Sequence, residues 1–210
     1  MREWPLRPAP QPGPPPPTEV AQLAAARVAE YAAVAAAGCE PTLVAQVATA
    51  AQLFVDVYRA GGQALIFGNG GSAADASHLA AEFVGRCTRD RRPLPAIALG
   101  DATATVTALA NDFGYQHVFA RQLEAHGRPV DLAVAFTTSG RSPNVLEGLA
   151  AARRLGIRSL VLTGREGEGL RDVADLVLVA PSSHTGRVQE VHQMWAHVFA
   201  EAVEVALFQD

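Results

Sequence analysis

Two groups of side chains in the chain could bind a metal ion or transfer protons. His78 and Glu82 are four residues apart in a helical pattern, so both project from one face of that helix. Gln189, His192 and His197 lie on a second helical pattern, where His197 sits about 80° round the axis from Gln189. An imidazole, a carboxylate, a second imidazole and an amide can form a divalent-metal site or an acid–base pair. A surface helix pair and a packed core histidine are the alternatives, and we expect His192 to be packed.

Two glycine- and hydroxyl-rich loops each follow a short apolar run. The run 64–67 leads into GNGGS at 68–72, and the run 132–136 leads into TTSGRS at 137–142. Glycines allow backbone N–H groups to crowd round an anion, hydroxyls donate hydrogen bonds, and a following helix adds the positive end of its dipole. The loops therefore predict a phosphate site that needs no lysine, although tight turns have a similar composition.

The first loop also fits the dinucleotide fingerprint GxGxxA, through Gly68, Gly70 and Ala73. This fingerprint alone is weak, and a ribose-binding acidic residue is expected about 20 residues further on, at the end of a second strand. Asp101 lies too far along the chain for that role. Two hydroxyl-rich loops therefore favour a monophosphate, and a nucleotide-dependent enzyme remains an alternative.

Short apolar runs alternate with helical or turn segments from residue 63 onward. The runs are Ala64–Phe67, Ala96–Leu99, Leu132–Phe136, Ser159–Leu162 and Leu176–Val179. Runs that are apolar on both faces and separated by crossovers predict a parallel sheet covered by helices on both sides. Ligands of such sheets bind beyond the carboxyl ends of the strands, so we expect the two loops to meet at one edge.

Helical patterns precede and follow the sheet. They span Thr18–Ala37, Pro41–Ala60 and about Arg187 to Phe208, and the apolar faces of the first two exceed what one small sheet would cover. We infer a helical oligomer interface from that surplus. Residues 1–17 are so rich in proline that we expect a disordered tail, followed by a single domain over 18–210 with a helical extension at 18–60.

Composition argues against several classes of protein. The formal net charge of -4 and the pI near 5.9 provide no basic field for nucleic acid. Cys39 and Cys87 show no CxxC spacing, which disfavours a disulfide framework or a cysteine metal site. No apolar run is expected to reach the roughly 20 residues that span a bilayer. We therefore expect a soluble, cytoplasmic protein with no membrane partner.

Taken together, the motifs resemble the phosphoheptose isomerases of the sugar isomerase (SIS) domain family. The matching segments run in order from about Thr18 to the carboxyl end: GNGGSAADASHLAAEFVGR, ANDFG at 110–114, TTSGRSPNV, LTGREG at 162–167 and RVQEVHQMWAH. The resemblance implies a three-layer α/β/α fold with a five-stranded parallel sheet of flavodoxin-like topology and added N-terminal helices. It also implies a homotetramer with sites at subunit interfaces.

The resemblance further implies a reaction and roles for individual residues. Sedoheptulose 7-phosphate would be converted to an aldoheptose 7-phosphate, the D-glycero-D-manno epimer, through a cis-enediol, with Glu82 as the base on carbon and His197 as the acid on oxygen. One Zn²⁺ per subunit would be held by His78, Glu82, Gln189 and His197. The substrate-binding residues would be Asn69, Gly70, Gly71, Ser72, Glu82, Asn111, Asp112, Thr137, Thr138, Ser139, Ser142 and Gln189.

The sequence departs from the family pattern at two places. Thr137 stands where serine is common, which keeps the hydroxyl, and the segment 183–187 (SHTGR) offers no carboxylate where some members use one. The second departure leaves the epimer of the product open. The alternative function is a non-catalytic SIS protein that binds a sugar phosphate or a replication initiator, and the presence of both Glu82 and His197 favours the enzyme.

Overall fold

The structure is a computed structural model that describes residues 17–208. Of the predicted disordered tail 1–17, residues 1–16 lie outside the described residues, and Pro17 belongs to the first helix instead. The chain divides into two compact units, Met1–Ala33 and Val34–Asp210. The first unit contains most of α1 (Pro17–Ala37), which begins on a proline, a residue that suits the first position of a helix.

The helix α1 corrects the expectation that no segment is long and apolar enough to span a membrane. Its residues Thr18–Ala37 form a 20-residue segment with a mean hydropathy of 1.2, which is sufficient by length and composition. The expectation was wrong because many alanines raise the mean hydropathy without a run of large apolar side chains. One such helix near the N-terminus is only a weak indication of a span.

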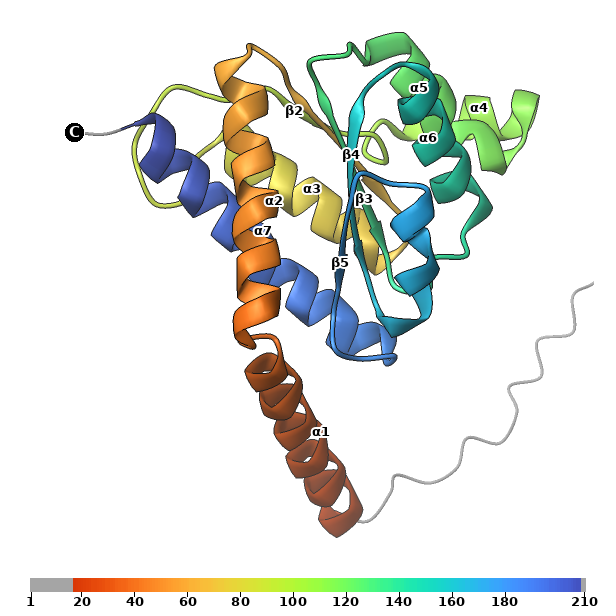
Figure 1. Cartoon of the computed structure of the whole chain (residues 1–210). Helices are drawn as coiled ribbons and strands as arrows, with labels where there is room; N and C mark the ends of the chain where they lie inside the picture. Colours follow the sequence, from red (N-terminus) through yellow and green to blue (C-terminus); the bar gives the residue numbers. More distant parts are fainter. Residues whose placement is uncertain (1–16, 209–210) are drawn as a thin grey trace, which may run out of the picture. The chain divides into compact units, whose positions relative to one another are not determined.

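The second unit is built on a five-stranded parallel sheet (Figure 1). Its strands are β1 (Ala64–Gly68), β2 (Ala96–Ala98), β3 (Leu132–Thr137), β4 (Arg158–Thr163) and β5 (Leu176–Val179). Their order is β2-β1-β3-β4-β5, the flavodoxin-like order in which the chain changes direction between β1 and β3. The predicted fold class and strand positions are therefore confirmed.

Helices cover both faces of the sheet in this unit (Figure 1). One face carries α2 (Pro41–Arg59), α3 (Gly71–Val84) and α7 (Thr185–Leu207). The other face carries α4 (Thr103–Phe113), α5 (Val118–His126) and α6 (Pro143–Arg154). Two short 3-10 helices, η1 (Tyr115–His117) and η2 (Arg165–Asp172), complete the crossovers.

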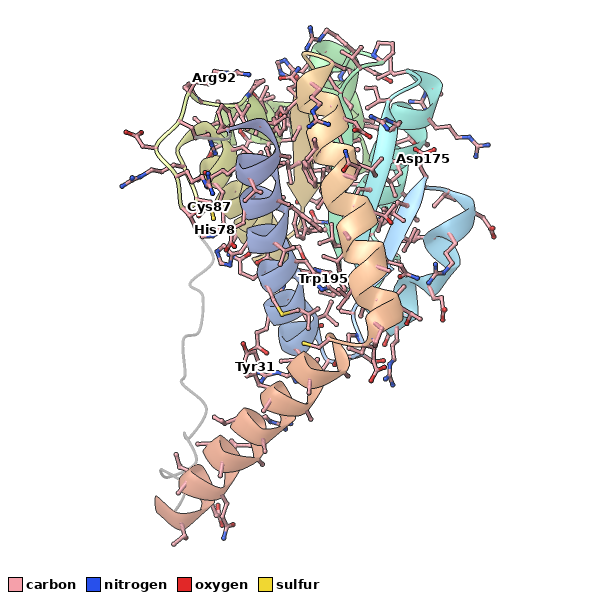
Figure 2. All side chains as sticks on the ribbon, turned by 60° about the vertical axis from the view of Figure 1, so that its left-hand side comes forward. Tyr31, His78, Cys87, Arg92, Asp175 and Trp195 are labelled. Atoms are coloured by element: carbon pink, nitrogen blue, oxygen red, sulfur yellow. The ribbon has the colours of Figure 1, made fainter. Side chains whose placement is uncertain are left out.

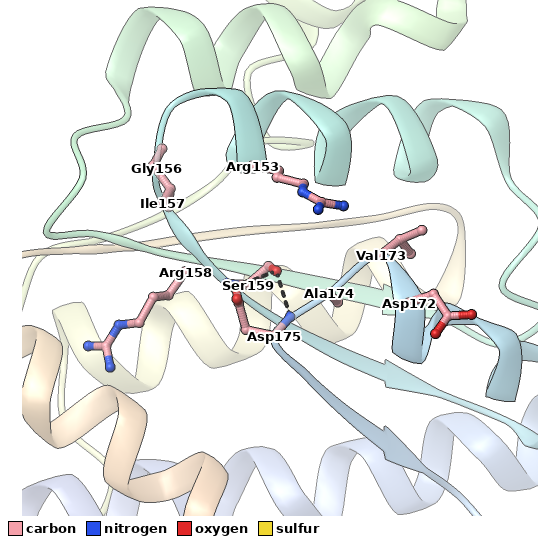
Figure 3. A pocket seen from close by; sticks show the side chains of 9 residues that line it. All are labelled: Arg153, Gly156, Ile157, Arg158, Ser159, Asp172, Val173, Ala174 and Asp175. Atoms are coloured by element: carbon pink, nitrogen blue, oxygen red, sulfur yellow. Dashed lines mark hydrogen bonds between the residues drawn. The ribbon is translucent and has the colours of Figure 1, made fainter.

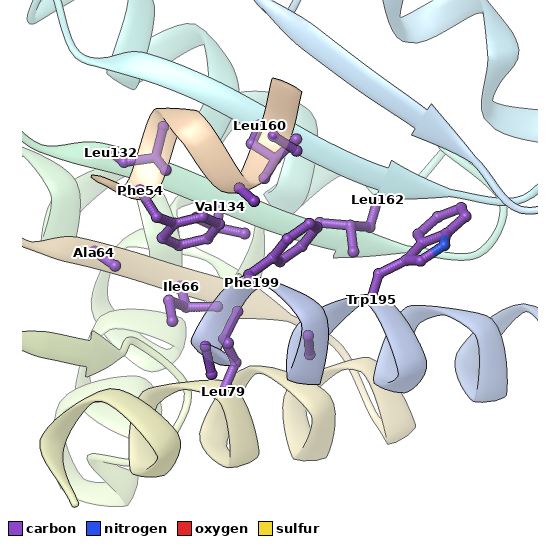
Figure 4. Packing of buried hydrophobic residues seen from close by; sticks show 14 of the residues in the cluster. Phe54, Ala64, Ile66, Leu79, Leu132, Val134, Leu160, Leu162, Trp195 and Phe199 are labelled. Atoms are coloured by element: carbon purple, nitrogen blue, oxygen red, sulfur yellow. The ribbon is translucent and has the colours of Figure 1, made fainter. Parts of the chain in front are cut away.

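A hydrophobic cluster fills the space on each face of the sheet. Ile66 of β1 faces the larger cluster and Phe67 faces the smaller one, as the two-residue period of a strand requires. In the larger cluster the ring of Phe54 lies 5.2 Å from that of Phe83. It also lies 5.3 Å from the ring of Phe199, and both of these side chains are labelled in Figure 4. These contacts bury the facing sides of α2, α3 and α7 together.

A buried carboxylate fixes the loop that follows α3. Glu204 of α7 has no exposed surface and accepts hydrogen bonds from the backbone N–H groups of Cys87, Thr88 and Arg89 at 2.8, 2.9 and 3.0 Å. The hydroxyl of Thr88 donates a fourth hydrogen bond at 2.9 Å. The loop is therefore folded round a side chain of the last helix.

Arg91 completes this anchor at the end of α3. Its side chain is 1% exposed, and its Nε donates to Glu204 Oε1 at 3.1 Å. Its terminal nitrogens donate to the carbonyls of Glu82 and Phe83 at 2.7 and 2.8 Å, and the Phe83 carbonyl also accepts from the N–H of Leu94 at 3.0 Å. These are carbonyls of the last helical turn, which have no partner within the helix. Arg91 thus ties the backbone at Glu82 to α7.

We predict that Glu204→Gln lowers the free energy of unfolding at pH 7 by about 3–5 kcal/mol, because it leaves the Arg91 charge buried without its partner. Burial alone would raise the pKa of Glu204, but the hydrogen bonds from Thr88, Cys87 and Arg89 outweigh it and lower the pKa to about 2. The pKa of a glutamate in an unfolded chain is about 4.3. The stabilisation by ionised Glu204 is therefore present above that pH and is lost as the pH falls toward 2.

Chemical denaturation at several pH values measures this effect. The matched control is Glu201→Gln on the exposed side of the same helix, which should stay within about 0.5 kcal/mol of the parent protein. Equal stabilities and parallel pH profiles for Glu204→Gln and the parent protein would contradict the assigned role of Glu204.

Candidate active site

A pocket of about 310 Å³ lies beyond the carboxyl ends of β1 and β3. The strand register pairs Gly68 with Phe136 and Thr137 with Thr163, so the loops after β1, β3 and β4 leave the sheet at one edge. The predicted meeting of the two glycine-rich loops is therefore confirmed. The lining residues are Asn69, Gly70, Gly71, Ser72, Phe136, Thr137, Thr138, Ser139, Ser142, Thr185 and Gln189.

Three helices begin at this pocket. Gly71 starts α3, Ser142 immediately precedes the first residue of α6, and Thr185 starts α7, and all three residues line the pocket. The N-terminus of a helix carries free N–H groups and the positive end of the helix dipole, which favour a bound anion. None of the described lining residues is a lysine or an arginine, and lysine is absent from the whole sequence. The pocket can therefore bind a phosphate through backbone and hydroxyl donors.

Two glycines of the first loop allow α3 to start against α7. Gly70 has a φ of 56°, a backbone conformation that residues with side chains rarely adopt. A Cβ atom on Gly71 would lie 2.4 Å from Nε2 of Gln189, so the absence of a side chain lets Gln189 close on the loop. The glycine-rich sequence thus places the amide of Gln189 at the pocket.

We predict that Gly71→Ala lowers kcat/KM for the sugar phosphate that the resemblance implies as substrate, by at least about tenfold. The added methyl group displaces Gln189 and shifts the lining of the pocket. Steady-state kinetics and circular dichroism of the two proteins measure the change and check the fold. Gly169→Ala is the matched control, since a Cβ atom there meets nothing within 4 Å. Parent-like activity of Gly71→Ala would show that Gln189 can move without consequence.

The loop after β3 is held by its own hydroxyl groups. The backbone N–H of Gly140 donates to Thr137 Oγ1 at 3.2 Å, and that of Arg141 donates to Ser139 Oγ at 3.4 Å. The side chain of Arg141 pairs with Glu166 and is 74% exposed. The hydroxyls therefore shape the loop at the pocket, while its one cationic side chain is directed elsewhere.

A cluster of three potential metal ligands joins α3 to α7. Nε2 of His78 lies 3.0 Å from Nε2 of His197 and 3.3 Å from Oε1 of Glu82. One ligand atom from each of the three residues lies within 4.8 Å of the others. The ligands of a tetrahedral zinc ion at about 2.1 Å are themselves about 3.4 Å apart, so this donor set fits zinc. Figure 2 shows His78 on the same side of α7 as Cys87.

The protonation of this cluster follows from its distances. A contact between two Nε2 atoms requires one ring to donate and the other to accept. His78 Nε2 also faces the carboxylate of Glu82, which can only accept while it is ionised, so we assign the proton to Nε2 of His78. A metal ion bound at this nitrogen would replace that proton. Nε2 of His197 is then the acceptor, and its lone pair faces the cluster.

Gln189 and the other three predicted metal ligands belong to different levels of the contact between α3 and α7. Gln189 lies against Gly71, whereas His197 lies against His78, and the helix rise separates these two positions of α7 by about 12 Å along its axis. The described chain therefore brings His78, Glu82 and His197 together and leaves Gln189 at the pocket. Metal binding by Gln189 stays a prediction.

The predicted substrate contacts Asn111 and Asp112 lie outside the pocket lining. Both are exposed at the end of α4, where Asn111 Nδ2 donates to Asp112 Oδ1 at 2.7 Å. No residue of α4 is buried in the described structure. Binding of the substrate by these two side chains stays a prediction.

His192 is packed inside the protein, as expected. It has no exposed surface, and its ring lies 5.7 Å from that of Phe136 and 6.0 Å from that of Trp195. Burial lowers the pKa of His192 to about 4, which keeps the ring neutral at physiological pH. A hydrogen bond with the backbone of Thr163 opposes this shift in part.

The sequence-based reasoning missed several polar residues close to the pocket. Asp75 is buried one turn before His78, its Oδ2 has no hydrogen-bond partner in the described structure, and burial raises its pKa to about 6. Asp75 lies on the buried face of α3 with Ser72, Ala76 and Leu79. A carboxylate among small and apolar side chains on one helix face is the sequence pattern that could have identified it. Thr185, Asn144 and Tyr115 gave no comparable signal.

A second groove, of about 340 Å³, lies at the opposite edge of the sheet (Figure 3). It is lined by residues at the starts of β4 and β5, where Asp175 accepts hydrogen bonds from the backbone N–H and hydroxyl of Ser159 at 2.7 and 3.0 Å. Its carboxylate is thus used to hold two strands together. The groove is slightly larger than the first pocket but contains none of the predicted site residues.

Comparison with known proteins identifies close relatives of the chain. The SIS domain family matches residues 29–164. A phosphoheptose isomerase from Roseiflexus sp. (strain RS-1) is 51% identical over 160 residues, which cover 76% of this chain and 81% of that protein. A phosphoheptose isomerase from Bradyrhizobium sp. (strain BTAi1) is 44% identical over 180 residues, which cover 86% and 91% of the two chains.

Solved structures show the same similarity. The structure of a phosphoheptose isomerase from Neisseria gonorrhoeae matches with a TM-score of 0.83 and 36% identity, over 89% of this chain and 99% of that one. A phosphoheptose isomerase from Francisella tularensis matches with a TM-score of 0.79 and 30% identity, over 90% and 97% of the two chains. The similarity thus extends from the motifs to the arrangement of the sheet and its helices.

Proposed function

Because the chain belongs to the phosphoheptose isomerases of the SIS domain family, we propose that it converts sedoheptulose 7-phosphate to D-glycero-D-manno-heptose 7-phosphate. The observation that carries this proposal is the separation of two sites on one helix. The phosphate pocket lies at Gly71, and the cluster of His78, Glu82 and His197 lies two turns further along α3. This rise of about 10 Å is comparable to the extended length of a seven-carbon phosphate.

The reaction moves a proton between C1 and C2 of the sugar and exchanges protons at O1 and O2. The carboxylate of Glu82 removes the proton from C1 of the ketose and returns it to C2 on the same face of a cis-enediol. His197 presents its Nε2 to the same space and serves the substrate oxygens, since an imidazole nitrogen can both accept and donate a proton. The side chain of Glu82 is only 18% exposed, which limits the access of competing water.

We propose that one Zn²⁺ per subunit binds to His78, Glu82 and His197, with Gln189 as a further predicted ligand. The short contacts between the first three side chains support this proposal. When bound, a zinc ion polarises substrate oxygens and stabilises negative charge on them. The exposed fraction of the His78 side chain, 40%, leaves the cluster open on one side.

We predict that Glu82→Gln lowers kcat by about 10²-fold or more, because it keeps the size of the side chain and removes its basicity. His197→Ala should show a comparable loss through the missing proton transfer at oxygen. The measurement is conversion of sedoheptulose 7-phosphate, with the aldose product identified by NMR. Glu201→Gln, on the exposed side of α7, is the matched control and should keep the parent rate.

The same assay distinguishes the alternative functions. A non-catalytic sugar-phosphate-binding or replication-initiator-binding SIS protein would bind the ketose phosphate and form no aldose. A nucleotide-dependent enzyme would instead be stabilised by NAD or NADP in a thermal-shift measurement. The epimer found by NMR decides the product that the segment 183–187 leaves open.

We predict that the purified protein contains about one zinc ion per chain and that His78→Ala lowers this content severalfold, because it removes one of three clustered donors. Elemental analysis by mass spectrometry measures the zinc content. His126→Ala, an exposed histidine outside the cluster, should leave it unchanged. Equal zinc content in both variants would exclude the cluster as the binding site.

We also propose a homotetramer with its active sites at subunit interfaces. Val20, Leu23 and Val28 are exposed along α1, and Phe113 and Tyr115 are exposed beside the predicted substrate contacts Asn111 and Asp112. A partner subunit at α4 would cover Phe113 and Tyr115 and complete the site, and a helical contact at α1 would cover the other three side chains. The cytoplasmic location stays a prediction.

A further inference from the structure

We infer that Asn144 and Tyr115 are positioning residues that hold the side-chain amide of Asn69 so that it presents an N–H donor to the substrate. The inference deepens the proposed function and rests on it, because Asn69 lines the phosphate pocket. It names the chemistry that Asn69 can recognise, which is an oxygen acceptor of the sugar phosphate. Neither Asn144 nor Tyr115 lines the pocket itself.

The amides of Asn69 and Asn144 form a reciprocal pair. Asn69 Nδ2 donates to Asn144 Oδ1 at 2.9 Å, and Asn144 Nδ2 donates to Asn69 Oδ1 at 2.8 Å. Asn144 is 1% exposed in the first turn of α6. The pair therefore links the loop after β1 to the helix whose N-terminus faces the pocket.

The orientation of this pair is fixed by the backbone of α6. A reciprocal pair alone would be equally stable with both amides turned over, because each would still donate once and accept once. The N–H of Val145, however, donates to Asn144 Oδ1 at 3.1 Å. The same N–H also donates to the carbonyl oxygen of Ser142 at 3.1 Å, so it is shared between two acceptors. Turning the amides would place the Nδ2 donor of Asn144 against this N–H donor, which favours the observed orientation.

Tyr115 fills the remaining acceptor position of Asn69. Its hydroxyl donates to Asn69 Oδ1 at 3.0 Å. An amide oxygen has two lone pairs, and those of Asn69 are used by Asn144 and Tyr115. The NH₂ group has two hydrogens, of which Asn144 takes one. The hydrogen-bonding capacity that Asn69 retains is therefore one N–H donor.

This arrangement predicts which substrate atoms Asn69 can contact. A donor that is held in place matches a hydroxyl, carbonyl or phosphate oxygen and cannot accept a hydrogen bond from a sugar hydroxyl. Tyr115 is the first residue of η1, which comes directly after α4. Its hydroxyl therefore connects the end of α4, which carries Asn111 and Asp112, to the pocket loop. Loss of Asn144 would free the amide to turn, whereas loss of the Tyr115 hydroxyl would leave one acceptor position of Asn69 Oδ1 unfilled.

The test is a double-mutant cycle between Tyr115→Phe and Asn69→Ala. Tyr115→Phe removes one hydroxyl and should lower kcat/KM for sedoheptulose 7-phosphate about three- to tenfold, mainly through KM, at an unchanged melting temperature. Once Asn69 is replaced by alanine, the same change should have no further effect. An undiminished loss in that background would overturn the inference.

A second cycle uses Asn144→Asp, which keeps an acceptor for the Val145 N–H and replaces the donor to Asn69 by an oxygen. It should lower kcat/KM about tenfold or more, and again the loss should vanish once Asn69→Ala is present. The matched control for Tyr115→Phe in the first cycle is Tyr58→Phe. The hydroxyl of Tyr58 has no hydrogen-bond partner in the described structure, so its removal should leave kcat/KM unchanged.

Both cycles are repeated on the affinity for sedoheptulose 7-phosphate, measured by calorimetry. If the parent protein binds this compound without turnover, the proposed function fails, and the coupling of the affinities to Asn69 still decides the positioning role. If turnover is normal and both cycles are additive, the positioning role fails alone. Absence of binding and turnover in the parent protein would contradict both.

Discussion

The close packing of α3 against α7 is the contact on which the site depends. The two helices run in the same direction, with Gly71 against Gln189 at their start and His78 against His197 further along. Beyond the end of α3, the loop is folded round Glu204 of α7. A shift of one helix along the other would separate the imidazoles and open the pocket at the same time, because one contact surface sets both.

The strand positions and the loops could be predicted from the sequence, because buried parallel strands and glycine-rich turns leave local patterns. The pairing of His78 with His197 left no local pattern and was implied only by the family resemblance, since 119 positions of chain separate the two residues and the packing of two helices brings them together. The spacing of four residues correctly placed Glu82 beside His78. The family resemblance grouped Gln189 with them; its side chain lines the pocket, and its binding of a metal ion stays a prediction.

Residues that act through hydrogen bonds to other side chains left no signal in the sequence. Asn144 follows a proline at the start of a helix, where asparagine is common, and only its partners across the sheet edge reveal its role. Tyr115 could have been part of an apolar surface. The alanine-rich α1 is the opposite case, in which a sequence pattern is present but does not specify one structure. Its length and hydropathy suit a membrane span, and a helix of a soluble protein can have the same composition.

Fixed donors give this site a different character from one built on cationic side chains. Lysine and arginine side chains are flexible and must be ordered when a phosphate binds. The backbone N–H groups at the starts of α3, α6 and α7 are already held in place by their helices. Glu82 and His197, which we propose as the reacting groups, lie on two of these same helices, α3 and α7. The distance between bound phosphate and reacting carbons is then set by the rise of α3, so a sugar phosphate of the wrong length would bind without placing its C1 and C2 at Glu82.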